Sequence, residues 1–217
     1  TKSLATYYFT SFLYKNFITN YLDFISHKEW QYMQRAICDR VTYVILGDKL
    51  YFHEYYDKFK IPMPKLLAYS IREKIFVNDV NDWISHDIST PETLNSVLSA
   101  LISKAANKAI FVKPTVSSGG QGIVRFSDQH GLISTDQTNR FLKNFLSGAF
   151  IYQEEVKQHS NLALLNPNSA NTIRIDTFKA KGKIPEVISA YLRIGRGHGF
   201  VDNLTSGGLR VGINMEN

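Results

Sequence analysis

The stretch that decides the fold is Ile110–Gly122, which reads I-F-V-K-P-T-V-S-S-G-G-Q-G. Its first three residues are apolar and of types that favour strands, so they predict a short strand. Lys113 follows while that strand is still buried or half-buried, where an unpaired ammonium group is costly. The serines and glycines that come next can turn successive backbone N–H groups toward one anion. The pattern is typical of a polyphosphate site, and a plain hairpin whose lysine reaches solvent is the alternative.

Two commoner nucleotide-binding motifs are absent from the sequence. No G-K-[ST] follows the glycines of Ser117–Gly122, and no strong helical pattern opens there, so the loop is not a P-loop. The second glycine cluster, Gly195–Gly199, has alternating spacing and lacks the Rossmann fingerprint. Any nucleotide site must therefore be of another kind.

The charge balance favours an anionic small-molecule partner. The 217 residues carry a formal net charge of +6. From Lys157 onward, eight Lys or Arg residues face four Asp or Glu residues. Such a surplus suits a nucleotide, an acidic sugar or a carboxylate. Nucleic acid is not expected, because the sequence has neither a dense basic block nor an aromatic-basic RNA-binding motif.

The cysteine, histidine and hydropathy patterns argue against a disulfide-bonded protein, a metal site built from cysteine or histidine, and a membrane-spanning protein. Cys38 is the only cysteine, so no disulfide framework and no cysteine metal site are expected. The six histidines show no metal-ligand spacing. No apolar run is long enough to span a membrane and no signal peptide is recognised, so a cytoplasmic location is expected by default. The oligomeric state is not indicated.

The spacing of apolar residues, together with capping and turn residues, predicts alternating helices and strands along most of the chain. Thr90 and Pro91 mark the start of one helix as an N-cap and a first-turn proline. The predicted helices are 10–25, 29–39, 49–59, 90–106 and 135–147, and the predicted strands are 41–46, 66–69, 110–112, 123–126 and 149–152.

An antiparallel hairpin is predicted near the C-terminus. Thr172–Phe178 alternates strictly, the segment 180–183 forms a turn, and the segment 185–194 returns. One face of the hairpin carries Arg174, Asp176 and Arg193. That face is either solvated surface or the wall of a site, and it becomes a site only if it borders the same cleft as the glycine loop.

Three segments, taken in order, resemble the ATP-grasp superfamily. They are Gly47-Asp48-Lys49 followed by a helix and Lys60–Pro64, then Phe111–Pro114 with the glycine loop, and then Tyr152–Val156. The tail of the chain is similar to the sugar-transfer-associated branch of that superfamily, whose genes tend to lie among polysaccharide-biosynthesis genes. The tail segments that carry this likeness are 165–174, 191–195, 201–203 and 206–208. The likeness covers residues 47–214.

The resemblance implies an α+β ATP-grasp fold in which two α+β lobes clamp a nucleotide after a helical N-terminal region. The expected boundaries are 1–60 for the helical region, 61–152 for the lid subdomain with its flap, and 153–217 for the second subdomain. The resemblance also implies Mg²⁺ held by a late Asp and an E-x-N pair. That motif is not found before Asn217, so the second subdomain is expected to be incomplete at its C-terminus and the metal ligands are unknown.

The resemblance also assigns the ATP contacts. Lys49 and Lys113 would hold the α- and β-phosphates, and Glu154 would accept a hydrogen bond from the adenine amino group. The backbone of Glu155 and Val156 would read the adenine edge. The flap over the triphosphate would consist of Ser117, Ser118, Gly119, Gly120, Gln121 and Gly122. The adenine-binding segment Tyr152–Val156 is called the hinge. A ribose-binding acid is expected soon after it, but this sequence has Lys157, Gln158 and His159 there.

A second group of residues would serve the reacting end of the site. Asn171, Arg174 and Arg193 would face the γ-phosphate and the developing acyl phosphate, since an arginine fork matches phosphate oxygens. The residues expected to shape the acceptor end are Asp202, Asn203, Gly207 and Gly208. Asp202 has an alternative role as a loop-capping residue.

The activity implied by the resemblance is ATP-dependent ligation of a carboxylate to an amine or a similar nucleophile, through an acyl phosphate. The expected partners are ATP, Mg²⁺ and an anionic small-molecule or sugar acceptor from surface polysaccharide synthesis. Two alternatives stay open. One is an ATP-grasp kinase that phosphorylates its acceptor directly, and the other is a nucleotide- or glycan-binding module without turnover.

Overall fold

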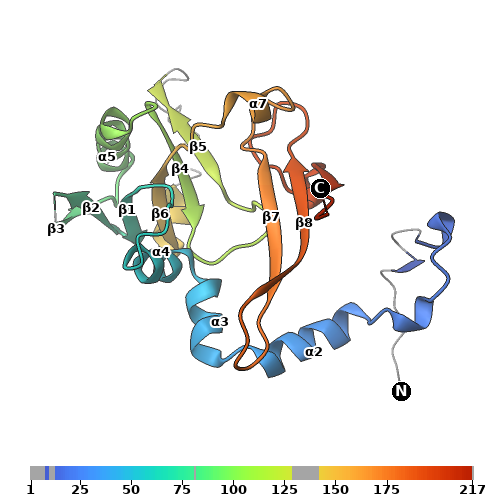
Figure 1. Cartoon of the computed structure of the whole chain (residues 1–217). Coiled ribbons are helices and arrows are strands. Elements are labelled where there is room, and N and C mark those ends of the chain that lie inside the picture. The colour runs from blue at the N-terminus through green and yellow to red at the C-terminus, as the bar shows by residue number, and fades with distance from the viewer. Residues whose placement is uncertain (1–7, 10–12, 81, 129–141, 217) are drawn as a thin grey trace. The chain divides into compact units, whose positions relative to one another are not determined.

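The computed structural model describes residues 8–9, 13–80, 82–128 and 142–216 (Figure 1). The chain divides into two compact units, Thr1–Phe52 and His53–Asn217, and each is described by itself. In the described part of the chain, no helix combines the length and the apolar character needed to cross a bilayer.

The first unit is helical. It contains the 3₁₀ turns η1 (Leu13–Asn16) and η2 (Tyr21–Asp23), the helices α2 (His27–Ile37) and α3 (Arg40–Gly47), and the start of α4 (Lys49–Asp57). Helix α2 begins with a capping box, because the Ser26 side chain accepts from the Glu29 N–H while the Glu29 side chain accepts from the Ser26 N–H. The predicted helices 29–39 and 49–59 are therefore confirmed.

Two predictions for the first unit are wrong. The predicted helix 10–25 is not continuous where it is described, because Phe17 takes a positive φ of 60° and Asn20 leaves the helical region. Residues 10–12 of that prediction lie outside the described residues. The predicted strand 41–46 is helix α3, because the Asp39 side chain accepts from the N–H groups of Val41 and Thr42 and so caps a helix. This cap overrides the β-type side chains of the segment.

The described part of the second unit contains a six-stranded antiparallel sheet with the order β3-β2-β1-β6-β4-β5. Its strands are β1 (Leu66–Ile71), β2 (Lys74–Asp79), β3 (Asp82–Asp87), β4 (Ala109–Pro114), β5 (Val124–Ser127) and β6 (Ala149–Glu154). Four of them match predicted strands. The β2–β3 pair was not predicted, since most of β3 is polar and exposed.

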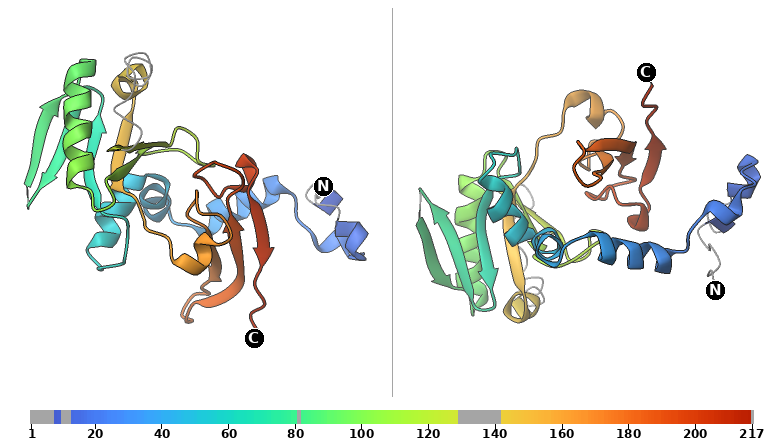
Figure 2. Two further views of the ribbon diagram at one scale, coloured as in Figure 1. Left: turned by 90° about the horizontal axis from the view of Figure 1, so that it is seen from above. Right: turned by 60° about the horizontal axis from the view of Figure 1, so that its bottom comes forward.

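Helix α5 (Pro91–Lys104) packs against one face of this sheet (Figures 1 and 2). Thr90 caps it and Pro91 occupies its first turn, as predicted. Leu94 and Leu98, one turn apart, are fully buried against sheet residues such as Ile110. Residues 142–147 are helical, whereas 135–141 of the predicted helix 135–147 lie outside the described residues. This core holds the strands that end at the site.

A smaller antiparallel sheet of three strands follows in the described part of the unit, with the order β7-β8-β9. It consists of β7 (Thr172–Phe178), β8 (Glu186–Ile194) and β9 (Leu209–Gly212), and the short helix α7 (Ser160–Ala163) precedes it. The predicted hairpin is confirmed, with a bulge between Asp176 and Thr177. Thr172 pairs with Arg193, which places both side chains on one face of the sheet.

The predicted division at 1–60, 61–152 and 153–217 stays a prediction. The six-stranded sheet ends at Glu154 and the three-stranded sheet begins at Thr172, so each proposed α+β lobe would contain one sheet.

Candidate functional site

A cavity of about 500 Å³ lies in the second unit, and residues of both of its sheets line it. Phe111 on β4 packs edge-on to Phe200, with 5.5 Å between the ring centroids, and both rings line the cavity. The remaining lining residues are Asn107, Lys113, Ile123, Arg125, Glu154, Glu155, Val156, Lys157, Gln158, Pro167, Asn168, Ser169, Ala170, Thr172, Val201 and Asp202.

Lys113 contributes its ammonium group to this cavity from strand β4. Its Nζ donates to Gln153 Oε1 at 3.0 Å and lies 5.8 Å from the centre of the Phe111 ring. Gln153 is buried on β6 and donates in turn to the Pro64 carbonyl at 3.4 Å. This chain of contacts orients the half-buried lysine toward the cavity.

The segment after β6 forms one edge of the cavity, and its backbone is held in place. The Glu154 N–H donates to the Lys65 carbonyl at 3.0 Å, and the Glu155 N–H donates to the Ala109 carbonyl at 3.2 Å. The Glu155 carbonyl accepts from Asn107 Nδ2 at 3.0 Å. The Glu155 N–H is therefore used inside the protein. Within the described residues, the Val156 backbone has no such bond.

Glu155 also forms an ion pair that was missed at the level of the sequence. Arg125 on β5 donates from Nε to Glu155 Oε1 at 2.6 Å and from Nη2 to Oε2 at 3.0 Å. The hydrogen bond to Glu155 is the main cause that raises the pKa of the Arg125 guanidinium, while partial burial opposes it. The only signal in the sequence was a polar position between Val124 and Phe126 in an alternating strand.

The glycine loop lies beside the cavity, against the segment that follows Val201. Gly119, Gly120 and Gly122 have φ values of 68°, 78° and 70°, which favour glycine. The Ser206 Oγ donates to the Gly119 carbonyl at 3.5 Å. A Cβ on Gly120 would lie 3.2 Å from Val201 Cγ1 and 3.6 Å from Asn203 Nδ2. The loop thus contacts Val201, which lines the cavity, although the loop itself does not line it.

Asp202 is tied into the wall by two partners. Its Oδ1 accepts from Arg193 Nη2 and its Oδ2 accepts from the Thr172 hydroxyl. Asp202 and Arg193 keep only 10% and 22% of their side-chain surface exposed. Among the described residues, the Arg193 Nε is buried without a hydrogen-bond partner. The pair therefore places a nearly buried charge network next to Thr172 at the cavity.

One comparison with known proteins identifies the chain. The family model for sugar-transfer-associated ATP-grasp proteins matches residues 29–217. The chain belongs to this ATP-grasp family. The suspected family and the α+β ATP-grasp fold are therefore confirmed, and membership implies an ATP-dependent enzyme that binds ATP. No curated protein matches the chain.

The cavity contains five of the ATP-grasp residues predicted for the site. They are Lys113, Glu154, Glu155, Val156 and Asp202. The loop residues Ser117, Ser118, Gly119, Gly120, Gln121 and Gly122 do not line it, and Asn203, Gly207 and Gly208 form a turn beside the loop. A Cβ on Gly208 would lie 2.6 Å from the Asp202 carbonyl oxygen, so the backbone there approaches very closely.

Asn171 and Arg174 do not line the cavity. The buried Asn171 amide donates to the carbonyls of Leu162 at 2.8 Å and Asn166 at 3.1 Å. Its oxygen accepts from the Gly195 N–H at 3.1 Å and from the Ser169 hydroxyl at 3.2 Å. The amide is saturated by these contacts, which favour a positioning role over a phosphate contact.

Lys49, Arg174 and Arg193 do not line the cavity, whereas Gln158, which follows the adenine-binding segment, does. Arg174 is exposed on β7, opposite Tyr191. Lys49 begins α4 in the first unit, where burial lowers the pKa of its ammonium group and Asp48 opposes that shift. Gln158 lines the cavity, but its side chain is bonded to the Asn171 N–H and to the Asn166 carbonyl, which argues against a ribose contact.

The ATP-grasp family usually works with a divalent metal ion. In the described part of the chain, no group of three or more His, Cys, Asp or Glu side chains is arranged to hold a metal. Asp202, an acidic residue of the cavity lining, is engaged by Arg193 and Thr172. The described residues therefore do not fit an Mg²⁺ site by themselves, and no residue is assigned to Mg²⁺.

Proposed function

We propose that this cavity binds ATP and that the protein is a carboxylate–amine ligase acting in the synthesis of a surface polysaccharide or another sugar conjugate. The observation that carries the proposal is the meeting of Lys113 with the segment Glu154–Val156 in one cavity. The lysine ammonium group suits the phosphates of a nucleotide, and the fixed backbone edge suits its base. The volume of about 500 Å³ lies within the range of roughly 300–1,000 Å³ that is usual for ligand pockets.

The adenine base would lie along the hinge. Its ring nitrogen would accept from the Val156 N–H, and its amino group would donate to the Glu154 carboxylate or to the Glu155 carbonyl. The Arg125–Glu155 pair fixes the hinge from behind. The Glu155 N–H is not proposed as an adenine contact, because it is bonded to the Ala109 carbonyl.

The triphosphate would extend toward Lys113, with the loop 117–122 closing over it. Charge-assisted hydrogen bonds of this kind contribute roughly 1.5–3 kcal/mol each. Lys49 is proposed as a second phosphate ligand on the resemblance alone. Arg193 does not line the cavity and its Nη2 is held by Asp202, so its proposed role in stabilising charge at the reacting end rests on the resemblance alone.

In the proposed reaction, an oxygen of the acceptor carboxylate attacks the γ-phosphorus of ATP and the bond to the β–γ bridging oxygen breaks. ADP leaves, and the acceptor carries the phosphoryl group as an acyl phosphate. An amine then attacks the acyl carbon and releases inorganic phosphate and a proton. A divalent metal ion would neutralise phosphate charge in such a reaction. The protein itself positions the groups and excludes water.

The first test is ligand-induced stabilisation. With Mg·ATP at 100 times its dissociation constant, the wild-type chain should gain ~2.7 kcal/mol of unfolding free energy. Lys113→Ala should lose most of this gain. Lys181→Ala is the matched control, because it removes an exposed lysine in the β7–β8 turn and should respond like the wild type. The ATP site is rejected if the wild type shows no stabilisation or if Lys113→Ala keeps it in full.

Product analysis separates ligation from direct phosphorylation. A ligase releases inorganic phosphate only when carboxylate and amine acceptors are both present. An ATP-grasp kinase instead yields ADP and a stable phosphorylated product with one acceptor. The second result would replace the ligase proposal by the kinase.

A further inference from the structure

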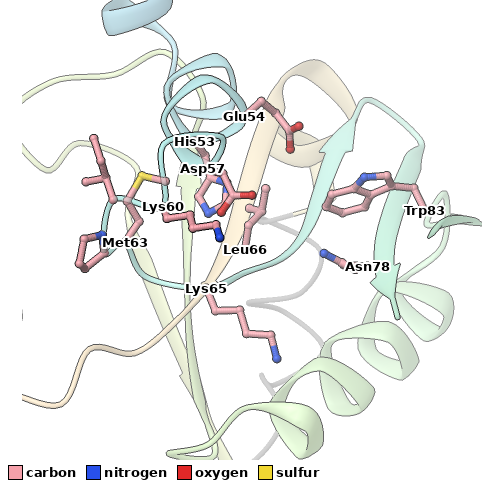
Figure 3. A pocket seen from close by; sticks show the side chains of 11 residues that line it. His53, Glu54, Asp57, Lys60, Met63, Lys65, Leu66, Asn78 and Trp83 are labelled. Atoms are coloured by element: carbon pink, nitrogen blue, oxygen red, sulfur yellow. The ribbon is translucent and has the colours of Figure 1, made fainter. Parts of the chain in front are cut away.

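A second and larger cavity, of about 680 Å³, lies in the second unit between the end of α4, the segment 60–66 and the β2–β3 pair (Figure 3). It shares no lining residue with the ATP cavity. None of its side chains was predicted to take part in the function. The pocket needs an explanation of its own.

An aromatic platform forms one side of this cavity. Trp83 lies on β3, opposite Asn78 on β2. Its indole meets the Tyr69 ring edge-on, with 4.9 Å between centroids, and Tyr69 stacks on Phe76 at 4.8 Å. These two contacts hold the half-buried indole in one orientation, which leaves an apolar surface available to a ligand.

Polar side chains stand across the cavity from Trp83 (Figure 3). Glu54 and Asp57 are three residues apart on α4, so they share one helix face. Lys60 and Lys65 are the cations of the lining. Two carboxylates and two ammonium groups balance, so the electrostatics do not favour a highly charged ligand.

His53 adds an unsatisfied acceptor or donor to this wall. Its Nδ1 is buried and lacks a hydrogen-bond partner among the described residues. Buried polar atoms of native proteins are almost always bonded, to protein, water or ligand.

We infer that this cavity binds a neutral saccharide. The apolar face of a pyranose ring would pack on Trp83, and its hydroxyls would donate to Glu54 and Asp57 and bond to the amide of Asn78. A nucleotide could also stack on an indole. Glu54 and Asp57 offset Lys60 and Lys65, however, so the lining offers no net positive charge to the phosphates of a nucleotide.

The site is an anchoring site rather than a reacting one, because no residue of the ATP cavity borders it. The two cavities adjoin where Lys65 meets Glu154, since the Lys65 ammonium lies 3.9 Å from the Glu154 carboxylate and the Lys65 carbonyl accepts from the Glu154 N–H. A saccharide held here would keep a larger sugar acceptor close to the nucleotide. Binding itself does not depend on ATP, so this inference stands apart from the proposed reaction.

Isothermal titration of the whole chain tests the inference. The probes are glucose, N-acetylglucosamine, cellobiose and chitobiose, with glucuronate and AMP as charged comparisons, each up to 10 mM. At least one neutral sugar should bind, and Trp83→Ala should weaken that binding at least tenfold. Trp30→Ala, which removes the exposed tryptophan of α2, should bind like the wild type.

Asn78→Ala and Asp57→Asn keep the test valid if Trp83→Ala fails to fold, because both residues are exposed and each should weaken binding at least threefold. The inference is overturned if no neutral sugar binds, if AMP alone binds, or if these variants bind like the wild type. Stabilisation by Mg·ATP is measured in parallel. It should persist in the Asn78 and Asp57 variants and be lost in Lys113→Ala, so failure of one site is distinguishable from failure of the other.

Discussion

Individual residues at the proposed nucleotide cavity differ in how many of their hydrogen-bonding groups are already bonded within the protein. Among the described residues, the Val156 backbone groups have no hydrogen-bond partner, whereas both backbone groups of Glu155 have protein partners. Asn171 has the residue type of a phosphate ligand, yet four internal contacts saturate its amide. A residue's chemistry therefore indicates a role only after its hydrogen bonds are counted.

Gly122 is a residue whose substitution should disturb the loop. Gly122→Ala places a side chain at φ 70°, which costs roughly 1–2 kcal/mol, and its Cβ would lie 2.8 Å from Pro114 Cγ. We expect a loss of about 2–3 kcal/mol in unfolding free energy, measured by urea denaturation, and weaker ATP binding.

Gly182→Ala is the matched control for that substitution. Gly182 has a similar φ of 74° but open space around its Cβ position, so only the backbone cost of about 1–2 kcal/mol should appear. Equal losses for the two variants would show that the contact with Pro114 is unimportant.

At the scale of elements, strands place polar side chains at the cavity, and capping residues determine where helices begin. Strand β5 presents Arg125 to the cavity while Phe126 faces the core, which is the ordinary alternation of a half-buried strand. Asp39 converts a β-type segment into helix α3, and Thr90 starts α5. One capping side chain thus outweighs the propensity of several residues that follow it.

The junction between β3 and α5 should make stability depend on acid pH. Hydrogen bonds from the Ser89 side chain and backbone, with a smaller contribution from Lys74, lower the pKa of Asp87 to about 2. The pKa of Asp87 in the folded protein is below the ordinary aspartate value of 3.8, so the ionised form stabilises the fold above that pH. This contribution should be lost as the pH falls from 3.8 toward 2.

Asp87→Asn removes that titration. Urea denaturation between pH 5 and pH 2.5 should show a shallower acid decline for the variant than for the wild type. Asp82→Asn, at the other end of β3, is the control and should keep the wild-type slope, since among the described residues the Asp82 carboxylate accepts only from the Trp83 N–H. Identical slopes for wild type and Asp87→Asn would contradict the assignment.

At the scale of the whole molecule, charge distinguishes the two cavities. The chain carries a net charge of +6, and the nucleotide site must attract a polyanion. The second cavity balances its charged side chains and is proposed to bind a neutral ligand. The two kinds of binding should therefore respond differently to salt.

Raising NaCl from 50 mM to 500 mM should weaken ATP binding by about five- to tenfold, because added ions screen the attraction. Saccharide binding in the second cavity should change by less than about twofold under the same conditions. Isothermal titration at both salt concentrations measures the two effects on one protein. Salt-independent ATP affinity would argue against a site built on Lys113 and the basic surplus.

Much of the fold could be read from local patterns. Apolar periodicity and turn residues predicted α2, α4, α5 and most strands, and the order of short motifs predicted the ATP-grasp family. Polar strands such as β3 gave too weak an alternation to be recognised, and the positive φ of Phe17 carries no sequence signature. Of the candidate site, Lys113 and the Glu154–Val156 hinge came from the sequence.

What the sequence determined by itself was most of the elements and the family, because caps, periodicity and motif order are local properties. Only the tertiary structure decided which charged groups meet. Arg125 reaches Glu155 across 30 residues of chain, and Thr172 reaches Asp202 across another 30. The cavity beside Trp83 is likewise assembled from α4 and the β2–β3 pair. Such partners depend on strand order and register, which no single segment encodes.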